Sequence, residues 1–489
     1  MAVKRYTANA DNTITNAYEP NLMTLGEKAN MGASDSMEVF TIWAQRSSSD
    51  DGASLEKSRA LVQFPVADII ADRAAGDIPA SGSVNFVLKI FNAEHPYTLP
   101  VNYDMSILPI SQSWSEGYGL DMETYQDHGE SNWLSRSVDT AWGTSGGTFH
   151  SESVYLADND ADTNTENIKT MYTASFGDAG TENIEVDISE LVEQWIDGTK
   201  DNYGVGLMMS GSYETDALSA SFYTKKFYTR TSEHYYKRPH IEARWDDSKK
   251  DDRANFYASS NLASAADNQN TLFLYNQVRG QLKNIPGLHS SNTLTVKLYR
   301  DSLTDNVPSE VIGGLTDDAG IYTASFTLET TASVLYDVWS TGSTELHTGS
   351  AITVKSLTAT QENPNPKYVT SMTNLRSSYS NQETARFRLF IRKQNWSPTI
   401  YTKATETLDS EIIDSAYFKI IRLSDNLEVI PFGTGSTNHT KLSYDQSGSY
   451  FDLDMGLLEE DYAYGMSFAY YINGKYVEQP EVFKFRIEE

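Results

Sequence analysis

Short runs in which apolar and polar residues alternate recur along the whole chain, and this period of two is typical of half-buried β-strands. Clear examples are the runs at 84–91 (VNFVLKIF), 294–301 (LTVKLYRD) and 385–393 (ARFRLFIRK). An Asn-Gly pair at 473–474, between two further runs, is the strongest hairpin signal in the chain. The pattern predicts an all-β protein.

One stretch, residues 183–209 (NIEVDISELVEQWIDGTKDNYGVGLMM), departs from this period. Its apolar residues recur at the spacing of an amphipathic helix: Ile188, Leu191, Val192, Trp195 and Ile196. Asp187 and Glu190 form a capping-box pattern, and Gly198 supplies a left-handed stop. We expect a helix here that closes one end of a β-sandwich core.

Two interruptions of the strand pattern divide the 489 residues. The run 245–253 (WDDSKKDDR) is charged and has no period, and paired prolines break regular structure at 362–367 (ENPNPK). A single core rarely grows beyond about 250–300 residues, so more than one domain is expected. We predict three tandem β-sandwich domains at 1–247, 254–356 and 364–489, the first with one inserted amphipathic helix.

Three segments need a more specific interpretation. Residues 46–56 (RSSSDDGASLE) are typical of a solvated loop. The basic, aromatic segment 225–238 (KKFYTRTSEHYYKR) indicates a long β-hairpin with a solvated tip or, alternatively, a docking arm for an acidic neighbouring subunit. In the second domain, 318–324 (DAGIYTA) resembles the tyrosine corner of immunoglobulin-like sandwiches, with Ala324 where a disulfide cysteine would stand. We expect the second and third domains to be immunoglobulin-like, the third with a fibronectin-like alternative.

The composition narrows the possible partners. The chain has 38 Lys and Arg against 67 Asp and Glu, for a formal charge of −29, so it repels nucleic acid and anionic lipid. It has no cysteine, so no disulfide scaffold, thiolate zinc site or thiol nucleophile is available. It has no run of about 18 apolar residues and no signal-peptide pattern at its N-terminus. We expect neither a nucleic-acid partner nor membrane insertion.

The best metal candidates are Asp158, Asp160 and Asp162, which alternate as the first ligands of a calcium loop do. The sixth position is Thr163 rather than Gly and the twelfth is Lys169 rather than Glu, which excludes an EF-hand. The alternatives are an irregular site for a structural divalent cation and a plain acidic loop. No other cofactor is expected.

Trp114, Trp133 and Trp142 lie in a region rich in tryptophan, glycine and acidic residues. Tryptophans in this setting anchor a loop or a core, and the alternative is a ligand-binding platform. The chain has no nucleophile elbow, phosphate loop or zinc motif, and its many carboxylates have no spacing that indicates an acid–base pair. We therefore expect no catalytic residues and no enzymatic activity.

The first half resembles the DNRLRE-type domain, a β-sandwich related to a carbohydrate-binding module family. The matching segments are RALVQF (59–64), WSEG (114–117), WGTSGG (142–147), DISELVEQWIDGTKDNYGVGL (187–207) and KRPHIEARW (237–245). The resemblance implies a β-sandwich fold. It suggests, as one function, adhesion through binding of a host surface polysaccharide.

The third domain resembles the C-terminal part of virion structural proteins of tailed bacteriophages, marine ones in particular. The resemblance lies in residues 385–406 and 428–487. It implies a structural component of the tail, baseplate or neck and collar region, made in the host cytoplasm and located in the virion. The implied partners are other virion proteins and copies of this chain in a symmetric ring. The alternatives are the carbohydrate-binding protein and, less favoured, a depolymerase.

Overall fold

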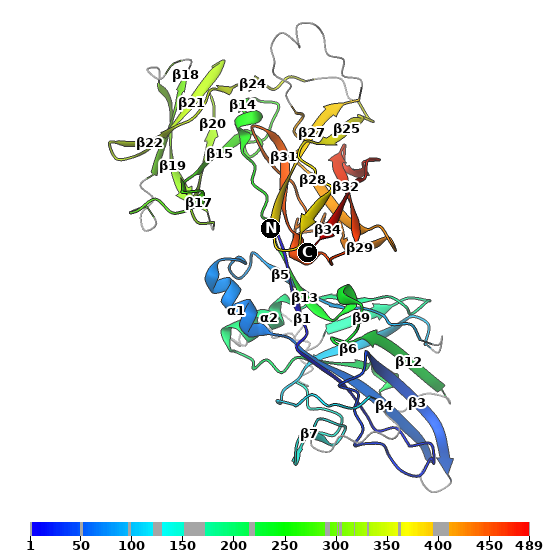
Figure 1. Cartoon of the computed structure of the whole chain (residues 1–489). Coiled ribbons are helices and arrows are strands. Elements are labelled where there is room, and N and C mark those ends of the chain that lie inside the picture. The colour runs from blue at the N-terminus through cyan, green and yellow to red at the C-terminus, as the bar shows by residue number, and fades with distance from the viewer. Residues whose placement is uncertain are drawn as a thin grey trace. The chain divides into compact units, whose positions relative to one another are not determined.

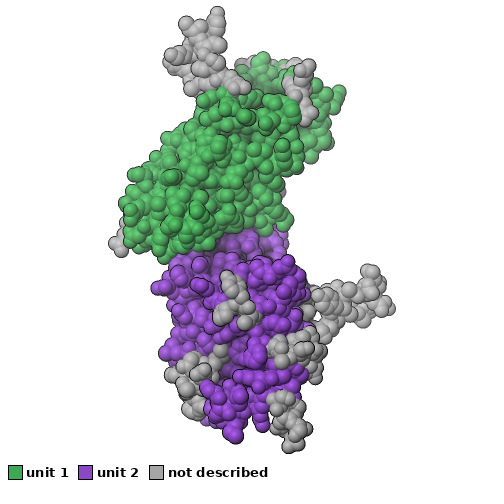
Figure 2. Space-filling model, turned by 90° about the vertical axis from the view of Figure 1, so that its right-hand side faces the viewer, with its two compact units in different colours: residues 1–2, 245–489 green, residues 3–244 purple. Residues whose placement is uncertain are grey.

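The computed structural model describes residues 2–48, 52–95, 99–120, 130–150, 172–214, 221–288, 294–300, 302, 306–316, 318–329, 332–359, 363–394 and 410–488. Over these ranges the protein is an all-β chain of sandwiches, which confirms the fold class indicated by the alternating pattern. The chain forms two compact units, one of residues 3–244 and one of residues 1–2 with 245–489 (Figure 2).

Two large antiparallel sheets and a short two-stranded one, β7-β8, build the unit of residues 3–244 (Figure 1). Its strands are β1 (Val3–Thr7), β2 (Ala10–Thr15), β3 (Ser36–Ser48), β4 (Gly52–Gln63), β5 (Asn85–Ile90), β6 (Tyr103–Pro109), β7 (Ser135–Ser137), β8 (Thr140–Ala141), β9 (Tyr172–Phe176), β10 (Ile184–Asp187), β11 (Val205–Met209), β12 (Ser221–Tyr228) and β13 (His240–Arg244). One sheet has the order β1-β13-β5-β10. The other has the order β12-β3-β4-β11-β6-β9, with β2 also paired to β4. Phe86 on β5 and Leu207 on β11 are fully buried, so both sheets contribute to the core.

The predicted helix is present as α2 (Ser189–Asp197). The Oδ1 of Asp187 accepts a hydrogen bond from the Ser189 backbone N–H at 2.9 Å. Gly198 ends the helix with a left-handed φ of 79°. The buried side chains are those at the predicted apolar spacing: Leu191, Val192 and Trp195. The helix and its glycine stop are therefore confirmed.

A second helix, α1 (Val66–Ala75), follows β4 directly. The first domain therefore has this helix in addition to the predicted one. Only Val66 and Ile69 are buried on α1, and its helical spacing is limited to Val66, Ile69 and Ile70, directly after an apolar run that reads as a strand. The guanidinium of Arg73 donates two hydrogen bonds to Glu193 on α2, at 2.6 and 2.7 Å. This ion pair joins the two helices.

The segment 46–56 is mostly β-structure, so its prediction as a solvated loop is wrong. Strands β3 and β4 continue through it, with Trp43 opposite Leu55 and Ser47 opposite Ala53. Glu56 is 1% exposed and accepts a backbone hydrogen bond from Tyr18 at 2.9 Å. A two-stranded ribbon tolerates serines such as Ser54 because its ladder satisfies the backbone whatever the side chains are.

The segment 225–238 is not a β-hairpin, which corrects the first interpretation of it. Its start belongs to β12, a 3-10 turn (Tyr235–Lys237) follows, and the chain then enters β13 in the other sheet. Lys225, at the start of this segment, is fully buried. Its ammonium donates to Asn92 Oδ1 and the Gly180 carbonyl, both at 2.6 Å. This contact explains how a lysine is accommodated in the core.

The unit of residues 1–2 and 245–489 begins with a β-domain in which one main sheet curves around the core. Its strands are β14 (Tyr257–Ala258), β15 (Gln269–Tyr275), β16 (Gln277–Val278), β17 (Gln281–Leu282), β18 (Leu294–Arg300), β19 (Asn306–Leu315), β20 (Ile321–Thr327), β21 (Val334–Thr341), β22 (Thr344–Thr348), β23 (Ile352–Thr353) and β24 (Lys355–Ser356). The sheet order is β15-β20-β19-β18-β21-β22, with β23 on β21. Strands β16 and β17 form a separate ribbon. The core is closed around Trp339, Leu272 and Phe326.

Tyr322, from the motif resembling a tyrosine corner, is buried. Its hydroxyl accepts a hydrogen bond from the Ile285 backbone N–H at 2.6 Å. The bond spans 37 residues, whereas a tyrosine corner closes a loop of a few residues. Tyr322 thus uses the same chemistry to fix a different loop.

The last sandwich has two sheets. Its strands are β25 (Tyr368–Met372), β26 (Ser378–Ser380), β27 (Thr384–Lys393), β28 (Ala416–Arg422), β29 (Leu427–Ile430), β30 (Ser443–Asp445), β31 (Gly448–Asp454), β32 (Ala463–Ile472), β33 (Lys475–Glu478) and β34 (Phe483–Glu488). The sheet orders are β25-β27-β31-β30 and β26-β34-β32-β28-β29, with β33 on β32. Stacked rings of Phe418 and Phe451, 4.2 Å apart, lie in its core. Asn473 and Gly474 both have positive φ and join β32 to β33, which confirms the predicted hairpin.

Candidate functional site: a buried charged joint

Residues 249–253, called the joint below, belong to the run predicted as the first linker. The joint lies alongside β30 of the last sandwich. The Tyr444 N–H donates to the Lys249 carbonyl at 2.9 Å, and the Asp251 N–H donates to the Tyr444 carbonyl at 3.0 Å. The chain then turns through a 3-10 segment (Asp252–Ala254) into the first sandwich of this unit. The charged run is therefore packed as a strand and a turn.

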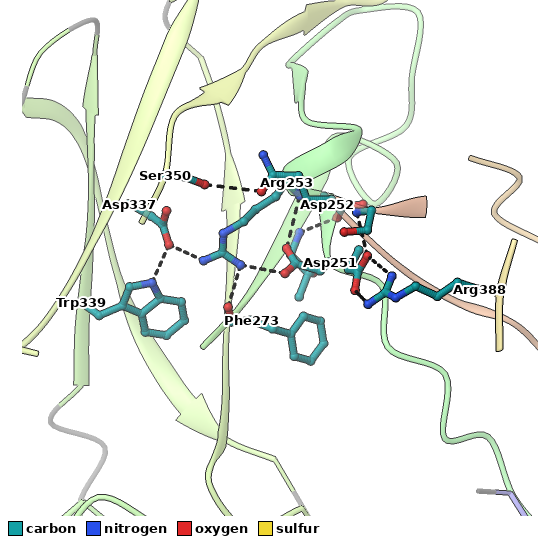
Figure 3. Close-up of polar contacts among 12 residues, drawn as sticks. Asp251, Asp252, Arg253, Phe273, Asp337, Trp339, Ser350 and Arg388 are labelled. Atoms are coloured by element: carbon teal, nitrogen blue, oxygen red, sulfur yellow. Dashed lines mark hydrogen bonds and ion pairs between the residues drawn. The ribbon is translucent and has the colours of Figure 1, made fainter. Parts of the chain in front are cut away.

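Arg253 is the centre of the joint (Figure 3). Its Nη1 donates to Asp251 Oδ2 at 2.7 Å and to the Phe273 carbonyl on β15 at 2.6 Å. Its Nη2 forms an ion pair with Asp337 Oδ2 on β21. The same Asp337 oxygen accepts the indole N–H of Trp339 at 2.6 Å. One guanidinium thus ties the joint to two strands of the neighbouring sandwich.

Asp252 connects the joint to both sandwiches. Its Oδ2 accepts the Thr271 backbone N–H on β15 at 2.6 Å. Its Oδ1 accepts the hydroxyl of Tyr444 on β30 at 2.7 Å. Because its two carboxylate oxygens accept hydrogen bonds from different sandwiches, the Asp252 side chain bridges the two sandwiches.

Two exposed ion pairs flank this centre. Lys249 meets Asp318 at 2.7 Å, on the turn between β19 and β20. Lys250 meets Asp414, just before β28, also at 2.7 Å. The successive residues Lys249 and Lys250 therefore contact different sandwiches, because neighbouring side chains of an extended chain point to opposite sides.

The joint contains more buried negative than positive charge. Asp251 is 4% exposed and Asp337 is fully buried, and both share Arg253. The second oxygen of Asp337, Oδ1, has no hydrogen-bond partner among the described residues. A Cβ on Gly349 would lie 1.9 Å from that oxygen, so only glycine allows the chain to close over it.

The pKa values follow from this arrangement. Burial raises the pKa of Asp251 to about 6, and the attraction of Arg253 only partly offsets the effect. Burial also raises the pKa of Asp252, against its hydrogen bonds from Thr271 and Tyr444. Burial alone would lower the pKa of Arg253, but its two carboxylate partners raise it. The joint can therefore take up a proton at mildly acidic pH, and its chemistry is that of a structural clamp.

A second buried cluster, called the sheet cluster below, consists of Arg5, Lys89, Glu185, Glu242 and Arg244 on the smaller sheet of residues 3–244. Glu242, 1% exposed, pairs with Arg5 and Arg244 at 2.7 Å each. Arg244 also meets Glu185 at 2.8 Å. Burial alone would raise the pKa of Glu242, but the surrounding cations hold it well below its usual range.

No motif in the sequence marks the residues of either cluster as a site. For Glu242 the pattern gave no signal, because Glu242 alternates with the apolar Ile241 and Ala243 and so falls on the polar side of β13. For Asp337 the signal was present, because Asp337 falls on the buried positions of β21 between Leu335 and Trp339. A charged residue at an inward position of a strand requires a buried partner.

The three tryptophans predicted as loop or core anchors, or as a ligand-binding platform, lie outside both charged clusters. Trp133 and Trp142 are 6% and 5% exposed in a core cluster. Trp114 is partly buried against that cluster and donates its indole N–H to the Tyr203 carbonyl at 2.9 Å. The calcium candidates Asp158, Asp160 and Asp162 lie outside the described residues.

Within the described ranges, no group of three or more His, Asp or Glu side chains is placed to hold a metal ion. In the same residues, no helix is long and apolar enough to cross a membrane.

No family model and no curated protein matches the chain. Among solved structures it is similar to a marsupial T cell receptor, at 9% identity over 48% of this chain and 71% of that one, with a TM-score of 0.16. It is similar to the chicken CNTN1 FN1-FN3 domains, at 9% identity over 58% and 87%, with a TM-score of 0.15.

A third likeness is to the native conformation of E. coli alpha-2-macroglobulin, at 8% identity, with a TM-score of 0.16. It covers 99% of this chain but 26% of that chain. Likenesses this distant carry no argument about function, which rests on the residues of this chain.

Proposed function

We propose that this chain is a non-enzymatic structural component of a tailed-phage virion, in the tail, baseplate or neck and collar region. It is made in the host cytoplasm and assembles with other virion proteins and with copies of itself. Its sandwiches serve as rigid supports whose loops and edges contact neighbouring subunits.

The resemblance of residues 385–406 and 428–487 to virion structural proteins is the source of this proposal. The formal charge of −29 is compatible with it, because an acidic surface keeps free subunits apart until salt or divalent ions screen it.

The observation that carries the proposal is the joint. Arg253 and Asp252 bind backbone and side-chain groups of two sandwiches, and Asp251 and Asp337 are buried around them. Burying this much charge favours one geometry over others, because a shifted arrangement leaves an unpaired buried ion. A fixed spacing between modules is useful to a protein whose task is to hold its neighbours in position.

Quantitative mass spectrometry of purified particles from the source tests the proposal. The expected result is the chain in particles, at a copy number that is a multiple of three or six relative to a known tail component. Absence from particles, with the free chain in the medium, contradicts it.

Carbohydrate binding by the first unit is the second candidate, and a group of half-buried aromatic rings favours it. Tyr223 on β12 pairs in register with Thr41 on β3, two residues from Trp43, so the Tyr223 and Trp43 rings belong to one sheet face. Tyr213 packs edge-on against Tyr223 at 5.6 Å. Such rings are suited to stacking on sugar rings.

A glycan array probed with the full chain tests this candidate. Binding that is lost in Trp43→Ala and kept in Phe222→Ala supports it, because Phe222 is exposed on the other face of β12. Binding that survives both changes, or no binding by the wild type, contradicts it.

A further inference from the structure

The ribbon of β16 and β17, called the finger below, stands apart from the main sheet of its sandwich. It lies at the edge of the sandwich beside the β17 label in Figure 1. Arg279 and Gly280 at its tip have φ values of 55° and 80°, which close a two-residue turn of the type that matches strand twist.

The base of the finger is firmly attached. The Asn276 side-chain amide donates to the Lys283 carbonyl at 2.6 Å, and the Lys283 N–H donates to the Asn276 carbonyl at 3.0 Å. The Gly320 N–H donates to Asn284 Oδ1 at 2.6 Å, and its carbonyl accepts the Asn276 N–H at 2.8 Å. These bonds hold the exposed finger in one shape, which reduces the entropy lost on binding.

The surface of the finger is both apolar and basic. Val278 is 44% exposed, and the register places it on the same face as Lys283. Arg279 and Lys283 are exposed, and neither forms an ion pair with a described carboxylate. Residues 268–300 contain no Asp or Glu, in a chain with 67 of them. The finger is therefore opposite in charge to the chain that carries it.

Helix α1 in the other unit offers a matching surface. Ile70 is 42% exposed, and it shares one helical face with three exposed alanines, Ala67, Ala71 and Ala74. Exposed carboxylates lie near both ends of this face, Asp68 in the first turn and Asp77 just after the helix. An apolar centre between two acidic groups complements Val278 between two basic ones.

We propose that the finger of one copy docks on the exposed face of α1 in a second copy of this chain. This inference rests on the proposed function and names the contact through which copies associate. Because the two surfaces differ, the contact is heterologous and generates a ring when its rotation closes.

A second copy fits better than a polyanion such as nucleic acid or an acidic glycan. The finger carries only two cationic side chains, and the charge of −29 repels an extended polyanion along the rest of the chain. Val278 also requires an apolar counterpart, which α1 supplies.

Sedimentation velocity of the full chain, over about 1 to 100 µM, tests the contact. The wild type is expected to associate, more weakly at high salt. Arg279→Glu with Lys283→Glu is expected to weaken association at least about tenfold, because two attractive pairs become repulsive.

Lys475→Glu with Lys484→Glu is the matched control. Both lysines are exposed in the last sandwich, and the change in charge is identical. It is expected to associate as the wild type does. Asp68→Lys with Asp77→Lys, mixed with the finger double variant, is expected to restore association, a result that misfolding cannot produce.

A monomeric wild type at every concentration overturns the inference. So does an equal loss of association in the control, or a failure of the mixed charge-reversed copies to associate while each variant keeps the thermal unfolding of the wild type. None of these results removes the chain from purified particles, so the proposed virion role is judged separately.

Discussion

The sheet cluster and the joint are both buried and charged, but their balance of charge is opposite. In the sheet cluster, Glu242 is surrounded by Arg5, Arg244 and Lys89. In the joint, Arg253 serves both Asp251 and Asp337. The excess of cations holds the Glu242 pKa well below normal, whereas burial without enough cations raises the Asp251 pKa to about 6.

The two clusters therefore respond to acid in opposite directions. Glu242 has a lower pKa folded than unfolded, so the stability it contributes at neutral pH is lost as the pH falls through its unfolded and then its folded pKa. Asp251 has a higher pKa folded, so its contribution is fully present below about 3.8 and is lost as the pH rises to about 6. Acid therefore weakens the sheet cluster, whereas it favours the folded form of the joint through Asp251.

The largest expected effect comes from removing the central anion of the sheet cluster. Glu242→Gln leaves Arg5 and Arg244 buried without their shared carboxylate, and should lower the free energy of unfolding by about 3–5 kcal/mol. Urea denaturation measures it. Glu185→Gln is the control, because Glu185 is half exposed and should cost less than about 1 kcal/mol. Equal effects would contradict the distinction between the two glutamates.

Removal of the central cation of the joint should have a smaller effect that depends on pH. Arg253→Met should cost about 3 kcal/mol at pH 8, and less at pH 5, because Asp251 can then become neutral. Urea denaturation at both pH values measures the difference. Arg376→Met, which breaks an exposed pair with Glu383, is the control and should leave the free energy of unfolding almost unchanged at either pH. A cost independent of pH would show that Asp251 takes up no proton.

Replacing Asp251 itself isolates its proton. Between pH 8 and pH 5, the free energy of unfolding of the wild type should rise relative to Asp251→Asn by about 1 kcal/mol, as expected for a carboxyl with a folded pKa of about 6. Parallel pH profiles of the two proteins would contradict the shifted pKa. Because the two proteins differ only at residue 251, the contributions of all other titrating groups cancel in the difference between their free energies of unfolding.

The smallest effect is expected at Lys89. Burial lowers its pKa, and its ammonium is 3.7 Å from Glu185, while two arginines remain on Glu242. Lys89→Met should change the free energy of unfolding by less than about 1 kcal/mol, because the excess of cations makes the third one dispensable. A loss similar to that of Glu242→Gln would mean that all three cations are required.

Local patterns predicted a large part of the fold. The period of two predicted strands such as β27 at 385–393, and the Asn473-Gly474 pair predicted the hairpin of β32 and β33. The helical spacing and Gly198 gave α2. These features depend on the backbone preferences of a few consecutive residues, and such preferences can be read from the chain.

The errors arose where partners distant in sequence decide the conformation. The segment 46–56 is polar enough for a loop, yet pairing between β3 and β4 makes most of it strand. Helix α1 buries only Val66 and Ile69, and its polar contacts are made with distant residues, such as that of Arg73 with Glu193, 120 residues away. Lys225 lies on an apparently solvated run, but carbonyls near Gly180 and the Asn92 side chain make its burial possible.

The sequence by itself determined the all-β class, the amphipathic helix, the acidic surface and the lack of thiol chemistry, because these follow from periodicity and composition. Only the tertiary structure decided that residues 249–253 form a buried joint and that Asp337 faces Arg253. The physical reason is that a buried charge is tolerated only where a partner meets it. The partners here lie 84 residues apart on different elements, and no local pattern records that they come together.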